Sequence, residues 1–80
     1  MYTKIEDLPI DYIGMADGFH YHQLLSGERA CIYEVTTPRE TFFRICTVIE
    51  CSDSHKVFYW TRIDFAKAVR KFNEMNNYAS

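Results

Sequence analysis

One run of residues constrains the fold more than any other part of the chain: residues 41–51, TFFRICTVIEC. Most of its side chains are aromatic or β-branched, and these types fit the pleated surface of a sheet. The run contains neither Gly nor Pro, so nothing in it interrupts the hydrogen bonding between strands. We therefore predict that residues 41–51 form the central strand of a small sheet.

Alternate residues of this run point to opposite faces of a sheet. One face is almost wholly apolar and carries Phe43, Ile45, Thr47, Ile49 and Cys51. The other face carries Phe42, Arg44, Cys46, Val48 and Glu50. In a strand with one face in water, apolar and polar residues alternate more regularly than they do here. We therefore expect at least part of the second face to be covered too, and a flanking loop is the simplest cover.

The neighbouring segments complete an antiparallel meander. Residues 18–25 and 30–36 both read as strands, and Ser26-Gly27 supplies a tight turn between them. Residues 56–60 follow a polar loop and form a short last strand. Short connections of this kind favour strands that are neighbours in the sheet.

The spacing of apolar residues changes after the last predicted strand. Phe65, Val69 and Phe72 recur at helical intervals, with alanines beside them and charged residues mostly opposite. Thr61 is the expected N-cap, because a Thr side chain can accept a hydrogen bond from the first helical turn. This pattern predicts an amphipathic helix over residues 61–77.

Together these segments predict an α+β fold: a four-stranded antiparallel β-meander with one C-terminal amphipathic helix packed on one face. A chain of 80 residues is expected to form a single domain. In this domain residues 18–60 are the meander and residues 61–77 the helix. Residues 1–17 are expected to dock on the body of the domain, because Ile5 and Leu8 are too apolar for a free tail.

Apolar side chains occur on both faces of several predicted strands, although one helix covers only one face of a four-stranded sheet. The second face therefore needs another cover. The candidates are the N-terminal segment, a second copy of the chain in a dimer, or another protein. Exposed apolar patches of more than a few hundred Å² usually mark such a contact.

Charge, cysteine content and hydropathy bear on the kind of partner and on the cellular compartment. A net charge of −2 argues against nucleic-acid binding, which normally goes with a basic balance. The three cysteines form no C-x-x-C pair and are typical of free thiols in a reducing compartment. No apolar run is long enough to span a membrane. We therefore expect a cytoplasmic protein without membrane contact.

No group of residues reaches the specificity of a catalytic or metal site. His20 and His22 lie about 7 Å apart on one side of a predicted strand, and a zinc site would need further ligands. The available ligands are Cys31, Cys46, Cys51 and His55. Two solvated polar residues are the simpler interpretation of the histidine pair. Cys51 and His55 flank a loop, but no third group orients them for nucleophilic catalysis. We expect no enzymatic activity, no metal and no cofactor.

The run Phe58-Tyr59-Trp60 suggests a second class of partner. Aromatic side chains on a sheet with basic neighbours can stack on single-stranded nucleic acid. The basic residues considered for this role are Arg44, Lys56, Arg62 and Lys67. In the simpler interpretation, Phe58 and Trp60 pack in the core against the helix and Tyr59 stays exposed or at an interface.

Several short motifs follow one another along the chain. They are Gly18-Phe19, the turn Ser26-Gly27, residues 30–34 (ACIYE) and residues 68–74 (AVRKFNE). With them the chain resembles short, uncharacterised proteins carried by prophages and mobile elements of gut-type bacteria. The resemblance covers residues 18–74 and leaves out the segment before them. It implies no activity and no catalytic residues.

We therefore predict a small non-enzymatic protein-binding module of a phage or mobile element, for example an inhibitor of a host defence or regulatory protein. The mobile-element context comes from the resemblance alone. The alternative is a nucleic-acid-binding accessory protein that uses the sheet aromatics. Tyr and Arg often carry the energy of an interface. The expected partner-binding residues are three exposed tyrosines, Tyr21, Tyr33 and Tyr59, with Arg44 as a polar anchor. The expected partner is a host protein or a second copy of the chain.

Overall fold

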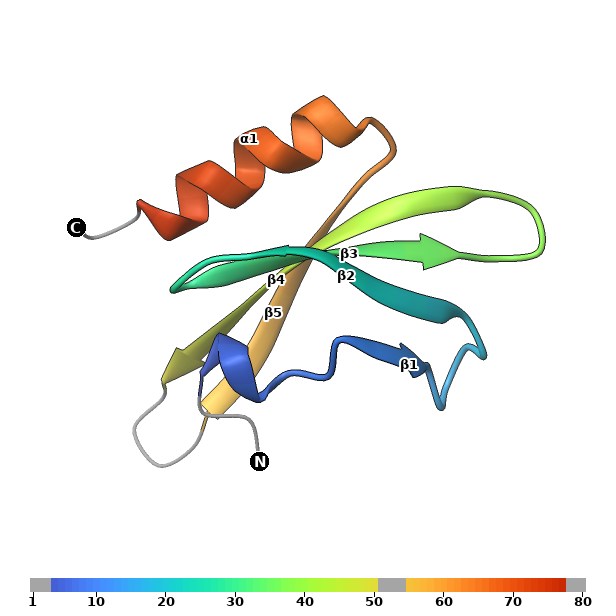
Figure 1. The fold of residues 1–80 in the computed structure, drawn as a ribbon, viewed down its shortest axis with the longest axis horizontal. Coiled ribbons are helices and arrows are strands. Elements are labelled where there is room, and N and C mark those ends of the chain that lie inside the picture. Colours follow the sequence, from blue (N-terminus) through green and yellow to red (C-terminus); the bar gives the residue numbers. More distant parts are fainter. Residues whose placement is uncertain (1–3, 51–54, 78–80) are drawn as a thin grey trace.

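A computed structural model describes residues 4–50 and 55–77, which form a five-stranded antiparallel sheet with a helix against it (Figure 1). The strands lie side by side in chain order. They are β1 (Asp11–Ile13), β2 (His20–Ser26), β3 (Ala30–Thr36), β4 (Thr41–Glu50) and β5 (His55–Arg62). A short 3-10 helix, η1 (Ile5–Asp7), precedes the sheet, and the helix α1 (Phe65–Asn76) follows it.

The predicted α+β meander with a C-terminal helix is confirmed, but it has five strands and not the predicted four. The additional strand is β1, which lies within the N-terminal segment. It pairs with β2 through Tyr12 and Tyr21 and through the residues on either side of them. Three residues are too few for an alternating pattern to be recognised, so only the pairing with β2 reveals this strand.

β4 is the longest strand and lies between β3 and β5, as predicted for the central run. In the middle of the sheet, Ile45 pairs with Ile32 of β3 and with Trp60 of β5. Ile45 and Ile32 are fully buried. Cys51, the last residue of the predicted strand, lies outside the described residues.

One face of the sheet packs against α1. Ala68 is fully buried, and its small side chain lets the helix come close to the strands. The residues around it are Ala30, Ile32, Phe43, Ile45, Trp60, Val69, Phe72 and Met75. Phe65, the first residue of the predicted apolar stripe, is 43% exposed, and its ring centre lies 5.1 Å from that of Phe43.

The helix begins later than predicted. β5 continues through Arg62, so Thr61 belongs to a strand and the prediction that it caps the helix is wrong. Asp64 is the N-cap, and its Oδ1 accepts a hydrogen bond from the backbone N–H of Ala66 at 2.8 Å. Asp and Thr are both favoured at this position, so composition alone does not choose between them.

The end of α1 is fastened to the turn between β2 and β3. Asn76 Oδ1 accepts hydrogen bonds from the backbone N–H groups of Arg29 at 2.8 Å and Ala30 at 3.1 Å. Gly27 lies so close that an added Cβ would be 2.4 Å from the same oxygen. The absence of a side chain at Gly27 therefore permits this contact between elements far apart in the sequence.

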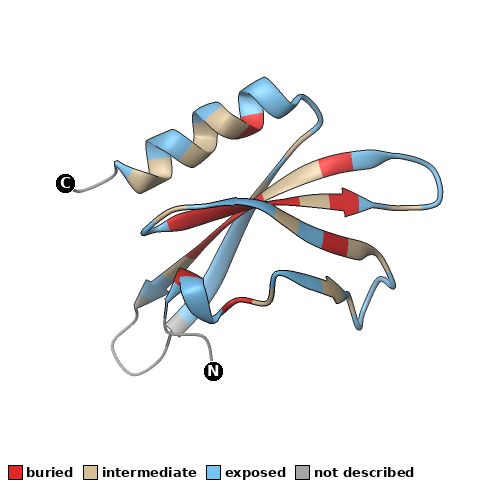
Figure 2. Ribbon diagram, viewed as in Figure 1, coloured by how far each residue is buried: buried red, intermediate tan, exposed pale blue. Residues whose placement is uncertain are grey.

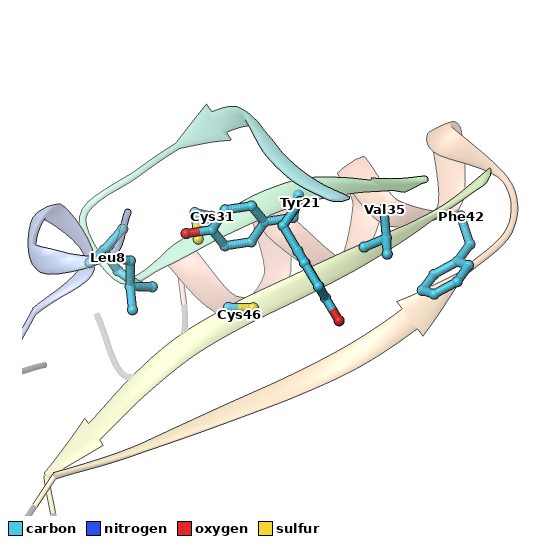
Figure 3. Packing of buried hydrophobic residues seen from close by; sticks show 8 residues of the cluster. Leu8, Tyr21, Cys31, Val35, Phe42 and Cys46 are labelled. Carbon is cyan, nitrogen blue, oxygen red and sulfur yellow. The ribbon is translucent and has the colours of Figure 1, made fainter. Parts of the chain in front are cut away.

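The opposite face of the sheet is covered in part by the N-terminal segment. Ile5 of η1 and Leu8 are buried in one cluster with residues of three strands (Figure 3). The strand residues of this cluster are Tyr21, Cys31, Tyr33, Val35, Phe42 and Cys46. Of the covers considered for this face, the N-terminal segment is the one seen in the structure.

A β-bulge in β2 changes which residues share a face. Gln23 pairs with Tyr33, but the next pair along is Leu25 with Ile32, so Leu24 is an extra residue. Regular alternation would place Gln23 and Leu25 on one face, but the bulge moves Leu25 to the face of α1. A regular alternation gives no sign of such an insertion.

Candidate functional site

The predicted binding residues lie on one face of the sheet, the one opposite α1, but only some of them are accessible. Tyr59 is 57% exposed, whereas Tyr21 and Tyr33 are buried, at 4% and 2%. The prediction that Tyr21 and Tyr33 are exposed is therefore wrong. Tyr12 of β1 stacks on Tyr21 with ring centres 4.7 Å apart, and the Tyr33 hydroxyl donates a hydrogen bond to the carbonyl of Pro9. The N-terminal segment thus covers both tyrosines.

Arg44 connects the buried and the exposed parts of this face. Its Nη1 donates a hydrogen bond to the Tyr21 hydroxyl at 2.8 Å. Its guanidinium carbon lies 4.3 Å from the centre of the Tyr59 ring, and 5.5 Å from that of Phe42. A guanidinium group within about 6 Å of a ring centre is attracted by the electron-rich ring face. Tyr59 is therefore held in place by a partly buried cation.

A carboxylate balances this cation through Tyr21. The Tyr21 hydroxyl donates a hydrogen bond to Asp17 Oδ2 at 2.6 Å. This bond, together with one from the backbone N–H of Phe19, lowers the pKa of Asp17. Burial and the bond to Asp17 raise the pKa of Tyr21 to about 12. Asp17, Tyr21, Arg44 and Tyr59 form a connected set that we call the Arg44 cluster.

The outer edge of β5 lies beside this cluster and is open. Across residues 4–50 and 55–77, no strand pairs with the side of β5 that faces away from β4. Val57 and Tyr59 are exposed on the face of Arg44, and Phe58 is exposed on the face of α1. Most of β5 is drawn in the colour of exposed residues in Figure 2. We call the open backbone of β5 with Val57, Phe58 and Tyr59 the β5 edge.

The aromatic run differs from its simpler interpretation at one position. Trp60 packs in the cluster under α1, and Tyr59 is exposed, both as that interpretation expects. Phe58, however, is 44% exposed and not part of that core. Lys71 of α1 lies 4.6 Å from the centre of the Trp60 ring. The helix therefore reaches Trp60 but leaves Phe58 accessible.

The sequence analysis missed an uneven distribution of charge. Residues 55–77 hold the cations Lys56, Arg62, Lys67, Arg70 and Lys71, and the carboxylates Asp64 and Glu74. Residues 4–50 contain more carboxylates than cations. The overall charge of −2 therefore conceals a basic C-terminal part, which includes β5. Counting charge for each segment separately would have revealed it.

The two histidines hold a carboxylate between them. His20 Nε2 lies 2.7 Å from Asp11 Oδ1, and His22 Nδ1 lies 3.0 Å from Asp11 Oδ2. These contacts lower the pKa of Asp11. The histidines point to the face opposite Cys31 and Cys46, so these thiols do not join them. In the described ranges, no three His, Cys, Asp or Glu side chains are arranged to hold a metal ion.

Among the described residues, Cys31 and Cys46 are the remaining candidates for a reactive group. Cys31 and Cys46 are free, buried and opposite each other on β3 and β4. A hydrogen bond to the Cys46 sulfur and burial raise the pKa of Cys31, which makes its thiol a poor nucleophile. The predicted pair of Cys51 and His55 cannot be assessed, because Cys51 and the His55 side chain lie outside the described part of the chain.

No family model, curated protein or solved structure matches the chain. The resemblance to proteins of prophages and mobile elements therefore stays a prediction. Neither helix of residues 4–50 and 55–77 is both long and apolar enough to cross a bilayer.

Proposed function

We propose that the chain is a small protein-binding module without enzymatic activity, and that its partner binds at the β5 edge. The observation that carries this proposal is an open edge strand with exposed apolar side chains on both of its faces. Natural proteins usually shorten, cover or charge such an edge, because its free N–H and C=O groups can pair with another chain. Here the open strand extends over His55–Arg62, and its middle, residues 57–61, contains no charged side chain.

An added strand would satisfy both features of this edge. Its backbone would pair with the free N–H and C=O groups of β5, which is the usual source of affinity in strand addition. Its alternate side chains would cover Val57 and Tyr59 on one face and Phe58 on the other. Open backbone groups and exposed apolar groups would then be buried in one step.

The Arg44 cluster prepares one contact residue for binding. Stacking on Arg44 restricts the Tyr59 ring before any partner arrives, so less side-chain freedom is lost on binding. Tyr59 and Arg44 thus remain in the proposed site from the original set. Tyr21 helps to position Arg44, because its hydroxyl accepts a hydrogen bond from the Arg44 guanidinium. Tyr33 belongs to the core, so we leave it out of the site.

Nucleic acid is the second candidate partner, and one observation favours it: Phe58 and Tyr59 are exposed aromatics on the basic strand that also carries Lys56 and Arg62. Binding of this kind would weaken steeply as salt is added. The narrower prediction, an inhibitor encoded by a phage or mobile element, is a proposal about context that rests on the sequence resemblance.

The proposal is tested by selecting peptides from a random display library on the immobilised chain and measuring their affinities. The double variant Val57→Ala/Tyr59→Ala should bind the selected peptides at least about ten-fold more weakly, because it removes apolar contacts on one face of the edge. Met15→Ala is the control, since Met15 is a fully exposed apolar residue away from β5. Equal binding by the double variant would refute the proposed site.

A further inference from the structure

We propose that the segment bound at the β5 edge is an extended acidic one, with a carboxylate near each end of the added strand. This inference rests on the proposed function and adds the chemistry of the partner. Its physical basis is the placement of basic side chains along and beside β5.

Two cations mark the ends of the exposed part of β5. Lys56 is exposed and Arg62 is partly exposed, and the strand contains no carboxylate between them. Both pair with residues of β4 on the face of α1, so their side chains share that face. Arg62 is six positions after Lys56, a distance of about 20 Å along a strand. Between them on that face are Phe58 and Trp60.

The helix adds more positive charge beside one end of the strand. A shallow hollow of about 200 Å³ is lined by Arg62, Lys67, Arg70, Lys71 and Glu74. Glu74 is the single carboxylate in this lining, and its Oε1 is 3.2 Å from Lys71 Nζ. On the opposite face of the sheet, the Arg44 guanidinium carbon lies 4.3 Å from the centre of the Tyr59 ring. Carboxylates of an added strand would meet cations from both faces.

A second copy of β5 fits this edge poorly. In an antiparallel pair of β5 strands centred on Tyr59, Lys56 of each copy would lie opposite Arg62 of the other. Like charges directly opposite each other destabilise a strand pair. Lys and Arg on an edge are also a common means of preventing self-association. The same charges that oppose self-pairing attract an acidic strand.

A peptide also matches the edge better than nucleic acid does. Backbone N–H and C=O groups repeat along the open side of β5, and an extended peptide offers acceptors and donors at the same spacing. The Thr61 carbonyl accepts a hydrogen bond from Arg62 Nη1 at 2.8 Å, which a bound carboxylate opposite Arg62 would replace. A phosphate backbone offers acceptors and no donors, so the carbonyl groups of the edge would stay without partners. The acidic peptide is therefore the occupant that uses both the backbone and the charges.

These positions define a probe. The seven-residue peptide Glu-Thr-Val-Thr-Val-Thr-Glu would place its carboxylates opposite Lys56 and Arg62 and its valines opposite Phe58 and Trp60. It reads the same in both directions, so the test does not depend on strand polarity. Two matched peptides carry Gln or Lys in place of both Glu residues. Trp60 is the one tryptophan of the chain, so its fluorescence reports binding by peptides that lack tryptophan.

We expect the Glu peptide to bind about five-fold more tightly than the Gln peptide at low salt, as two surface ion pairs would give, and added salt to reduce the difference. The Lys peptide should bind most weakly. Lys56→Glu/Arg62→Glu should reverse the order of the Glu and Lys peptides. Lys56→Glu alone changes an exposed position and should weaken the preference in the same direction. Circular dichroism checks that each variant is folded.

The other outcomes are separable. Equal binding of all three peptides, weakened alike by Val57→Ala/Tyr59→Ala, would overturn the acidic partner and leave the proposed function standing. Peptide binding that ignores the edge variants would overturn both. Tighter binding of oligo-dT than of the Glu peptide would overturn the inference in favour of nucleic acid. A dimer by light scattering that dissociates on Tyr59→Ala would overturn it in favour of a second copy.

Discussion

Arg44 is the residue on which the proposed site depends. It is a cation placed among aromatic rings, and its Nε is buried without a hydrogen-bond partner in the described structure. Its favourable contacts are the ring faces and the Tyr21 hydroxyl, which itself donates to Asp17. A side chain held in this way orders the exposed Tyr59 above it.

The ionisation of Tyr21 gives a test of this arrangement. Its pKa is raised from 10.0 to about 12 in the folded protein, first by burial and then by the bond to Asp17. A raised pKa contributes stability that is complete below pH 10 and is lost as the pH rises through about 12. Burial also raises the pKa of Tyr33. The free energy of unfolding should therefore fall over this alkaline range.

In Tyr21→Phe, this alkaline loss should be smaller, because one of the two tyrosines no longer ionises. At pH 7 the variant should be less stable by about 1–3 kcal/mol, since Arg44 and Asp17 lose their shared partner. Urea unfolding at pH 7 and at several alkaline pH values measures both effects. Tyr59→Phe is the matched control on an exposed ring and should change neither. An unchanged pH slope in Tyr21→Phe would contradict the assignment.

At the scale of elements, long regular segments could be predicted and short or irregular ones could not. β3 and β4 were identified because each is an unbroken run rich in β-branched and aromatic residues. β1 was missed, because its short segment becomes a strand only by pairing with β2. The bulge at Leu24 and the extension of β5 through Arg62 also depend on pairing partners. Local sequence does not contain that information.

The joint between α1 and the β2–β3 turn is an element-scale feature that was not predicted either. The sequence pattern predicted only a helix that includes Asn76, whereas Asn76 Oδ1 accepts two backbone hydrogen bonds from the turn. Asn76→Ala should lower the free energy of unfolding by about 1–2 kcal/mol, because these N–H groups lose their acceptor. Urea unfolding measures the change, with Asn73→Ala as an exposed control on the same helix. Equal stability of the two variants would show that the joint is unimportant.

At the scale of the whole molecule, the sheet is covered unevenly. α1 covers the middle of one face and the N-terminal segment covers part of the other, whereas most of β5 is exposed (Figures 1 and 2). The sequence indicated that a second apolar face needed a cover. It did not indicate which tyrosines that cover would bury, because alternation assigns a face and not the position of a distant segment.

Charge is also distributed unevenly over the molecule. The N-terminal part of the chain is acidic, and the open edge belongs to the basic C-terminal part. The candidate site was thus predicted only in part: Tyr59 and Arg44 from residue type, but neither the open edge nor its charge. Strand order decides which strand is left without a neighbour, and that order exists only in the folded chain.

Backbone hydrogen exchange of the chain, with and without a peptide selected from the display library, tests most directly whether β5 is the binding edge. Strand addition predicts that amides of His55–Arg62 that exchange quickly in the free chain become protected, while β1, the other edge strand, is unchanged. Protection confined to β1 or α1, or bound peptide with no new protection in β5, would contradict binding at the β5 edge.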